Sequence, residues 1–244
     1  MNKTISPIFL YIETATEICS VALSKGDKII ACEEMQGYSH AEKLFPLIDM
    51  LFNKTGIEKT TLRAIVLSIG PGSYTGLRIG ASAAKGFAYT LNIPVITIST
   101  LQSIMLGAQA SLSLSGITSV ATSQSKLLYS PMIDAGRMEV YTTLFNHDAQ
   151  MIREVHAEII NETSFQKQLQ EQLVCFCGNG MPKCKPLLEK YPNAVFSDAP
   201  LSARNMLVPA LQKYQLGLFE DTAYFEPFYL KEYIARKSSV KGLR

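Results

Sequence analysis

A short apolar segment that runs into three closely spaced glycines, and then into a helix, constrains this chain most. Residues 64–69 are too apolar to alternate, with Ser68 as the one polar residue, as expected for a strand buried on both faces. Glycines at positions 70, 72 and 76 follow, and a helix is expected over residues 75–91. Glycines let the backbone turn tightly, and free N–H groups at a helix start attract anions. The pattern therefore predicts a strand–loop–helix unit of an α/β protein.

The same loop is a candidate site for a nucleotide or another anion. Arg78 lies one turn into the expected helix, where its charge can reinforce the attraction. The spacing does not match a P-loop, which requires G-x-x-x-x-G-K-[ST]. A plain strand-to-helix turn also explains the glycines, so both interpretations stay open. The candidate residues are Gly70, Gly72, Ser73, Thr75, Gly76 and Arg78.

The order of the expected elements points to a fold class. Ser39 and Glu42 have the spacing of a capping box at the start of a helix that Gly56 ends. The first hundred residues then follow the order β-β-β-α-β-α-β, which is typical of half of an actin-like or Hsp70-like (ASKHA) fold. Expected strands cover residues 9–12, 19–24, 28–35, 64–69 and 95–98, and expected helices follow Ser39, cover 75–91 and follow Thr100.

The second half of the chain also has α/β character. A polar stretch at residues 111–125 marks a boundary between lobes. We therefore predict an α/β, two-lobed fold in which each lobe is a mixed sheet with flanking helices. The expected division is a first lobe at 1–105, a second lobe at 106–215 and a C-terminal segment at 216–244 that returns to the first lobe. Expected second-lobe elements are strands at 127–134, 138–145 and 173–177 and a helix that opens at Ser202.

Composition and charge exclude several classes of protein. Hydrophobic residues make up 47% of the 244 residues and charged residues 18%, which suits a buried core and not a disordered chain. The net charge is +2, so a free-standing nucleic-acid binder is not expected. No stretch of 18 apolar residues is free of charges, and we expect a cytoplasmic protein without a membrane span. Basic residues cluster only near the end, at Lys231, Arg236, Lys237, Lys241 and Arg244.

Motifs for metal binding and catalysis are not found in the sequence. The five cysteines do not have the paired spacing of a zinc site, and their odd number indicates free thiols. Neither G-x-S-x-G nor H-E-x-x-H occurs, so we assign no catalytic residue. Asp134, Arg137 and Glu139 form a polar set between two expected strands, for which a structural ion pair is preferred over a ligand site.

The string GPGSYTGLRIG closely resembles the signature of the TsaB (YeaZ) family. Further segments resemble that family in the same order along the chain. They are residues 12–16 with 20–23, Ser39-His40 with Leu44-Phe45-Pro46, Ile133-Asp134-Ala135 with residues 137–141, and Pro227-Phe228-Tyr229-Leu230. The first 100 residues match strongly and the rest only in islands.

The resemblance implies a function in the threonylcarbamoylation of the adenosine next to the anticodon of tRNA. The chain is then a non-catalytic subunit that binds and activates a TsaD-like transferase. A TsaE-like ATPase and a homodimer are further implied partners, and tRNA is reached only through the complex. The resemblance implies no tightly bound cofactor, and it allows weak binding of ATP or ADP at the partner interface. The alternative is a stand-alone ATP-dependent kinase or acyl transferase of the actin-like fold.

Two departures from the family's patterns bear on this choice. The first strand of the family usually ends in Asp near the phosphate site, whereas this chain has Glu13. The TsaD subunit holds its metal with a helical H-x-x-x-H pair, but here His40 is followed by Leu44 at that offset. We therefore expect no metal at His40 and interpret it as a helix-start histidine with a surface hydrogen bond.

Small residues recur every four positions along the helix expected at 75–91. Such a stripe lets another helix approach closely, or packs the helix on its own sheet. In the resembled family the first two helices of the N-terminal lobe bind the catalytic subunit. We therefore expect the partner interface to comprise His40, Leu44, Leu47, Gly76, Gly80, Ala84 and Phe87.

Overall fold

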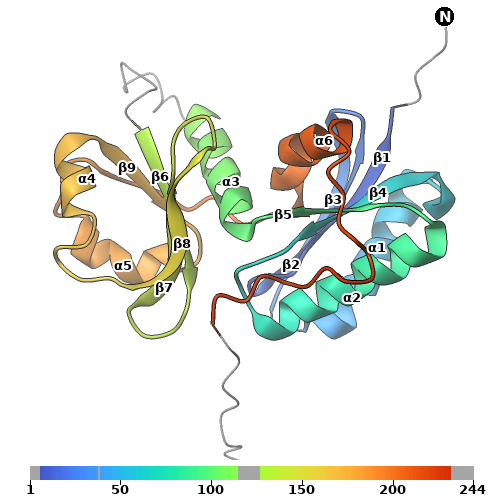
Figure 1. The fold of residues 1–244 in the computed structure, drawn as a ribbon, viewed down its shortest axis with the longest axis horizontal. Helices are drawn as coiled ribbons and strands as arrows, with labels where there is room; N and C mark the ends of the chain where they lie inside the picture. Colours follow the sequence, from blue (N-terminus) through green and yellow to red (C-terminus); the bar gives the residue numbers. More distant parts are fainter. Residues whose placement is uncertain (1–5, 38, 115–126, 232–244) are drawn as a thin grey trace, which may run out of the picture.

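The first lobe is built on a mixed five-stranded sheet. The computed structural model describes residues 6–37, 39–114 and 127–231. The sheet order is β3-β2-β1-β4-β5, in which the first three strands form an antiparallel meander and β4 and β5 run parallel to β1. The strands are β1 (Ile8–Glu13), β2 (Ile18–Lys25), β3 (Lys28–Gln36), β4 (Leu62–Ser68) and β5 (Val95–Ile98) (Figure 1).

Alternation along β1 gives this sheet two separate cores. Leu10 and Ile12 face α1 (His40–Thr55) and α2 (Tyr74–Leu91), whereas Phe9 and Tyr11 face the opposite side. That opposite side is covered by the short 3₁₀ turn η4 (Ala203–Met206) and by α6 (Leu207–Gln215). Burying one such large side chain contributes about 1.5–3 kcal/mol. Because both faces are covered, β1 is apolar up to Ile12, and even its last residue, Glu13, is buried.

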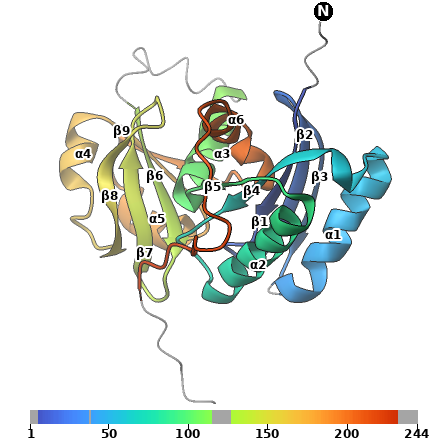
Figure 2. The same cartoon turned by 45° about the vertical axis from the view of Figure 1, so that its right-hand side comes forward.

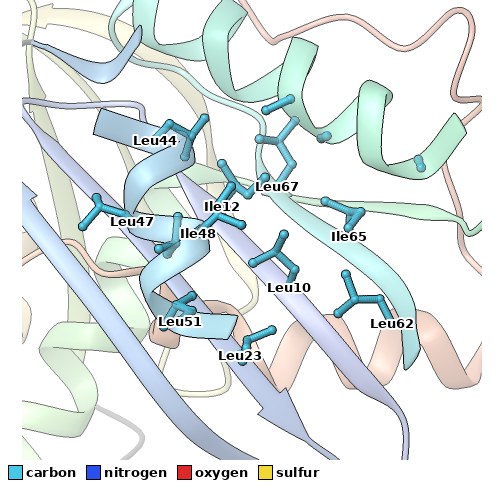
Figure 3. Packing of buried hydrophobic residues seen from close by; sticks show 14 of the residues in the cluster. Leu10, Ile12, Leu23, Leu44, Leu47, Ile48, Leu51, Leu62, Ile65 and Leu67 are labelled. Carbon is cyan, nitrogen blue, oxygen red and sulfur yellow. The ribbon is translucent and has the colours of Figure 1, made fainter. Parts of the chain in front are cut away.

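Helix α1 ends as expected from the sequence, but its start lacks the expected cap. Ser39 is the N-cap residue, but its side chain makes no capping hydrogen bond, so the capping box expected with Glu42 does not form. Gly56 ends the helix in the left-handed conformation, with a φ of 65°. The inward face of α1 carries Leu44, Leu47, Ile48 and Leu51, which pack against Leu10, Ile12 and Leu23 of the sheet (Figure 3).

The second lobe is a second mixed five-stranded sheet with the order β10-β9-β6-β7-β8. Its central strand β6 pairs antiparallel with β7 and parallel with β9. Together the two sheets confirm the expectation of a two-lobed α/β fold. The strands are β6 (Leu127–Asp134), β7 (Glu139–Phe145), β8 (Met151–Ile159), β9 (Leu173–Cys177) and β10 (Ala194–Ser197), and the helices are α3 (Thr100–Leu114), α4 (Gln166–Glu171) and α5 (Met181–Leu188).

The packing divides the chain differently from the expected ranges 1–105 and 106–215. Helix α3 begins at Thr100 and buries Leu101 and Met105 against second-lobe residues such as Tyr129. Residues 203–215 pack on the first sheet, because Met206 and Ala210 share a core with Phe9. The second lobe therefore extends from about the start of α3 to the turn before η4. Most of the polar boundary stretch, residues 115–125, lies outside the described residues.

Residues 216–231, which we call the C-terminal strap, run along the first lobe and end at the second. Glu220 forms an antiparallel bridge with Val95 at the edge of the first sheet. Phe225 is buried in the same core as α2, and the backbone N–H of Phe228 donates to the carbonyl of Ile69 over 2.8 Å. Figures 1 and 2 show the strap in red, passing β5 and α2 before it reaches the gap between the lobes.

No helix in the described part of the chain is both long enough and apolar enough to cross a bilayer.

Candidate functional site

The glycines of the loop before α2 are required by close contacts within the chain. Gly70 has a φ of +117°, and a Cβ there would lie 2.5 Å from the carbonyl oxygen of Phe228 in the strap. A Cβ on Gly72 would lie 2.4 Å from the carbonyl oxygen of Ala15. Larger residues at either position would push the strap or the loop after β1 away. The geometry therefore favours the plain-turn interpretation of these two glycines over a ligand-approach role.

The start of α2 also directs polar groups to the chain itself. The backbone N–H of Ser73 donates to the carbonyl of Ala15 over 2.6 Å. The Ser73 hydroxyl then accepts from the N–H of Gly76 over 3.3 Å, as a helix cap. Thr75 is exposed beside this cap. These contacts use donors that an anion at the helix start would need.

Arg78 lies against aromatic rings of α2 and the strap, away from the glycines. Its guanidinium is 4.1 Å from the centre of the Tyr74 ring. Its Nε donates to the hydroxyl of Tyr229 over 3.3 Å, and the two tyrosine rings are 4.7 Å apart. The structure therefore places this arginine on the outer side of α2, where it holds the strap.

Glu13, at the end of β1, is fully buried. Its Oε1 accepts a hydrogen bond from the N–H of Ala15 over 2.7 Å, while its Oε2 has no partner among the described residues. Burial raises the pKa of this carboxyl to about 7, against the smaller opposing effect of the hydrogen bond from Ala15. A carboxyl sealed in the core does not reach a metal ion in the cleft. The residue that stands where the actin-like fold has its phosphate-site carboxylate thus does not fit a nucleotide–metal complex.

A cleft of about 600 Å³ lies between the two lobes. The loop after β1, the start of α2, the turn after β6 and strap residues 228–231 line it. Asn179 links its two walls, because its Nδ2 donates to Glu17 of the first lobe over 2.9 Å. The Oδ1 of Asn179 accepts from the backbone N–H of Asp134 over 3.1 Å. The lobes are therefore tied together across the cleft by one amide side chain.

The polar set expected between two strands forms ion pairs, but with lysines from elsewhere. Asp134 pairs with Lys183 at 2.6 Å, and Glu139 pairs with Lys231 of the strap at 2.6 Å. Burial acts to raise the pKa of Asp134, yet the hydrogen bonds from Lys183 and the Gly136 N–H hold it below its ordinary value. Arg137 is exposed and occupies the left-handed turn position, with a φ of 48°.

His40 is not the surface histidine that the sequence suggests. The side chain is only 3% exposed, and its Nε2 lies 2.7 Å from the carbonyl oxygen of Thr16. Nε2 must carry the proton, since a carbonyl can only accept. His40 therefore holds the loop after β1 in place through this hydrogen bond. Among the described residues, no group of three or more His, Cys, Asp or Glu side chains is placed to hold a metal ion.

Most of the expected partner interface is buried inside the first lobe. Leu44 and Leu47 are 0% and 2% exposed and lie on the inward face of α1, as Figure 3 shows. Gly76 and Gly80 face Thr14, whose atoms would lie within 2.4 Å of a Cβ at either glycine. Ala84 is also fully buried in the core below α2. The small-residue stripe packs α2 on its own sheet and is not a docking surface.

The outer faces of α1 and α2 instead form a groove of about 660 Å³, which we call the α1–α2 groove. Of the seven expected interface residues, only Phe87 lines it. Phe45, which is not among the expected interface residues, is 52% exposed, and its ring centre lies 6.1 Å from that of Phe87. The sequence signal that could have identified Phe45 was its position next to Leu44, because the neighbour of an inward-facing helix residue lies on a different face of the helix. The groove has apolar walls from Phe45, Ile79, Ala83, Phe87 and Leu91, with Lys59 and Arg78 among its other residues.

Comparison with known proteins establishes the relationship. The protein named tRNA threonylcarbamoyladenosine biosynthesis protein TsaB from Escherichia coli (strain K12) is 32% identical over 238 residues, covering 93% of this chain and 96% of the relative. The chain belongs to the TsaB family. The TsaB of Haemophilus influenzae is 29% identical, with 93% and 95% of the two chains covered. The family model described as TsaD: tRNA N6-adenosine threonylcarbamoyltransferase matches residues 34–196.

Solved structures show that the TsaB-family fold is present. The structure named YeaZ from Pseudomonas aeruginosa superposes with a TM-score of 0.68 at 22% identity, covering 92% of this chain and all of the other. A second Pseudomonas aeruginosa structure, described as similar to peptidase YEAZ, has a TM-score of 0.70 at 23% identity and covers 92% and 100% of the two chains. The expected TsaB relationship and the actin-like, two-lobed fold are thus confirmed.

Proposed function

We propose that this chain is a non-catalytic subunit in the biosynthesis of threonylcarbamoyladenosine in tRNA, and that it binds a TsaD-type transferase through the α1–α2 groove. Similar proteins named for this pathway match 93% of the chain, which supports the pathway. The single structural observation that carries the docking surface is the aromatic pair in the groove, formed by the exposed Phe45 and the half-buried Phe87. Exposed apolar patches of this kind mark protein–protein contacts.

Relatedness to the transferase supports the geometry of docking. The match to the transferase family model implies that the partner has equivalent helices. Two related chains can then pair through the same helices, as in a two-fold dimer. A homodimer of this chain is accordingly proposed for the protein alone. A TsaE-type ATPase and tRNA join through the transferase, and assembly takes place in the cytoplasm.

Several buried groups support a non-catalytic role. His40 is engaged with Thr16, and Leu44 stands at the i+4 position where a second metal-binding histidine would be needed. Glu13 is sealed below the cleft, and strap residues 228–231 line the cleft itself. Tight nucleotide binding by the isolated chain is therefore not proposed, whereas weak binding of ATP or ADP at the partner interface is. The same observations disfavour a stand-alone kinase or acyl transferase.

The test is the variant Phe45→Ser, with Tyr89→Ser as its matched control. Tyr89 is an exposed aromatic residue of α2, 88% accessible, that does not line the groove. Removing an aromatic anchor from an interface costs about 2 kcal/mol or more, so Phe45→Ser should weaken binding to the TsaD subunit of the same organism at least tenfold. Both variants should melt close to the unchanged chain. Equal affinities of the two variants, measured by calorimetry, would contradict docking at the groove.

A further inference from the structure

Arg78 belongs to two surfaces at once. It is exposed and lines the α1–α2 groove, and its guanidinium also donates to Tyr229 of the strap over 3.3 Å. The side chain makes no ion pair with any carboxylate in the described part of the chain, and its contacts there are with tyrosines. Lys59, the other cation of the groove, is already paired with Asp49 at 2.7 Å. Among the described residues, Arg78 is thus the groove cation without a salt bridge, and Glu226 of the strap attracts it only at longer range.

A carboxylate is a stronger partner for a guanidinium than a neutral hydroxyl. Hydrogen bonds between charged groups are shorter and roughly twice as strong as neutral ones, and an arginine can form two in parallel with a carboxylate. A partner helix in the groove with an Asp or Glu near Arg78 would therefore draw the guanidinium away from Tyr229. The groove offers such a helix an apolar wall and a cationic end.

The strap depends on Arg78 at the point where it enters the cleft. Tyr229 stacks on Tyr74 with ring centres 4.7 Å apart, and residues 228–231 form part of the cleft lining. Beyond Tyr229, Lys231 is held by Glu139 of the second lobe at 2.6 Å, and both side chains are partly exposed. Exposed ion pairs contribute little, typically below about 1 kcal/mol. Beyond the backbone hydrogen bond of Phe228 to Ile69, Tyr229 is therefore held by the Tyr74 ring and by Arg78.

We propose that a partner carboxylate docked at the α1–α2 groove competes with Tyr229 for Arg78, so that partner binding loosens strap residues 229–231 and uncovers the interlobe cleft. This inference rests on the proposed docking function. By linkage, if partner binding favours release of Tyr229 from Arg78, then release of Tyr229 favours partner binding by the same factor. The cleft, lined by Tyr74, and the groove, lined by Arg78 one turn further along α2, are then coupled through a single side chain.

The first experiment compares hydrogen exchange in the free chain and in its complex with the TsaD subunit of the same organism. We expect slower exchange in peptides from residues 79–91 and faster exchange in peptides from residues 226–231. Slower exchange at 79–91 with unchanged or slower exchange in the strap overturns the coupling but leaves docking standing. Unchanged exchange at 79–91 overturns the docking function itself.

The second experiment uses Tyr229→Phe, which removes the hydroxyl and keeps the ring. Its matched control is Tyr224→Phe, the same change at a strap tyrosine that is 83% exposed. Removing the hydroxyl that competes for Arg78 should tighten binding of the TsaD subunit by roughly twofold to tenfold. Tyr224→Phe should leave the affinity unchanged. Unchanged or weaker binding by Tyr229→Phe, measured by calorimetry, overturns the competition.

Discussion

The hydroxyl of Thr14 donates to the backbone carbonyl of Gly76 over 2.8 Å, which fixes the first turn of α2 to the loop after β1. The side chain of Thr14 also fills the space beside Gly80, one turn further along the helix. This contact decides which surface the small-residue stripe serves. Because the stripe is occupied from within, a substitution there acts on the stability of the monomer.

Gly80→Ala should destabilise the chain, and Gly86→Ala should stabilise it. A Cβ at Gly80 would lie 2.4 Å from Thr14 Oγ1, and overpacking of this kind costs about 1–3 kcal/mol. Gly86 is on the same helix with open space around it, so alanine there gains about 0.5–1 kcal/mol. Thermal melts should show opposite shifts, of about 2–4 °C for each kcal/mol. Shifts of the same sign would mean that Thr14 does not occupy this space in solution.

Glu13 should make the stability of the chain depend on pH. Its pKa is raised by burial from the ordinary 4.5 to about 7 in the folded chain. Between these values the unfolded chain loses the proton first, so the folded state loses stability as the pH rises from about 4.5 to 7. The loss approaches about 3 kcal/mol and is constant above that range.

Glu13→Gln, which cannot ionise, removes this dependence. Relative to the unchanged chain, the variant should become more stable by up to about 3 kcal/mol between pH 4.5 and pH 8. Urea unfolding at both pH values measures the difference. Glu42→Gln, which removes a carboxylate from the exposed side of α1, controls for the change in net charge. An effect of Glu13→Gln that is independent of pH would show that Glu13 is ionised in the fold.

The isolated chain should not transfer a threonylcarbamoyl group. The expectation rests on Leu44 at the position of the second metal-binding histidine and on the engagement of His40 with Thr16. The purified protein, incubated with tRNA and threonylcarbamoyl-adenylate, should leave the adenosine unmodified by mass spectrometry, whereas addition of the TsaD subunit restores modification. Modification by the chain alone would make it an enzyme.

Binding of tRNA by the chain alone should be weak and strongly dependent on salt. The net charge is only +2, and contacts with phosphates release counterions, which lowers affinity as salt rises. Removing residues 231–244 should abolish most of the binding in a filter assay. Of the basic residues in this segment, Arg236, Lys237, Lys241 and Arg244 lie outside the described residues. Tight binding at high salt, or after the deletion, would refute this.

The first lobe follows from the sequence better than the second because its signals are local. Residues 64–69 are apolar except for Ser68, and Gly56 ends α1 as glycine at a helix end should. Strand β8 escaped prediction because Arg153, Glu154 and His156 interrupt its alternation at the edge of the second sheet. Helix α5 was not predicted, because its two prolines, Pro182 and Pro186, are residues that usually interrupt a helix.

The candidate site could be predicted less well than the fold, because the sequence does not show which part of the protein packs against a given face of a helix. The four-residue spacing of Gly76, Gly80 and Ala84 fits a partner helix and the chain's own sheet equally. Only the position of Thr14 distinguishes them, and it comes from a different strand-end loop. Likewise, His40 beside a helix start gives no indication that the carbonyl of Thr16 lies above it.

The return of residues 203–215 to the first sheet sets an order of events during synthesis on the ribosome. Phe9 and Tyr11 are made early, but the residues that cover them, such as Met206 and Ala210, emerge only after the whole second sheet. Residues 100–202 form an uninterrupted stretch and can fold while one apolar face of the first sheet is still bare. The nascent chain is therefore most prone to aggregation shortly before α6 emerges, and the first lobe is the last to be completed.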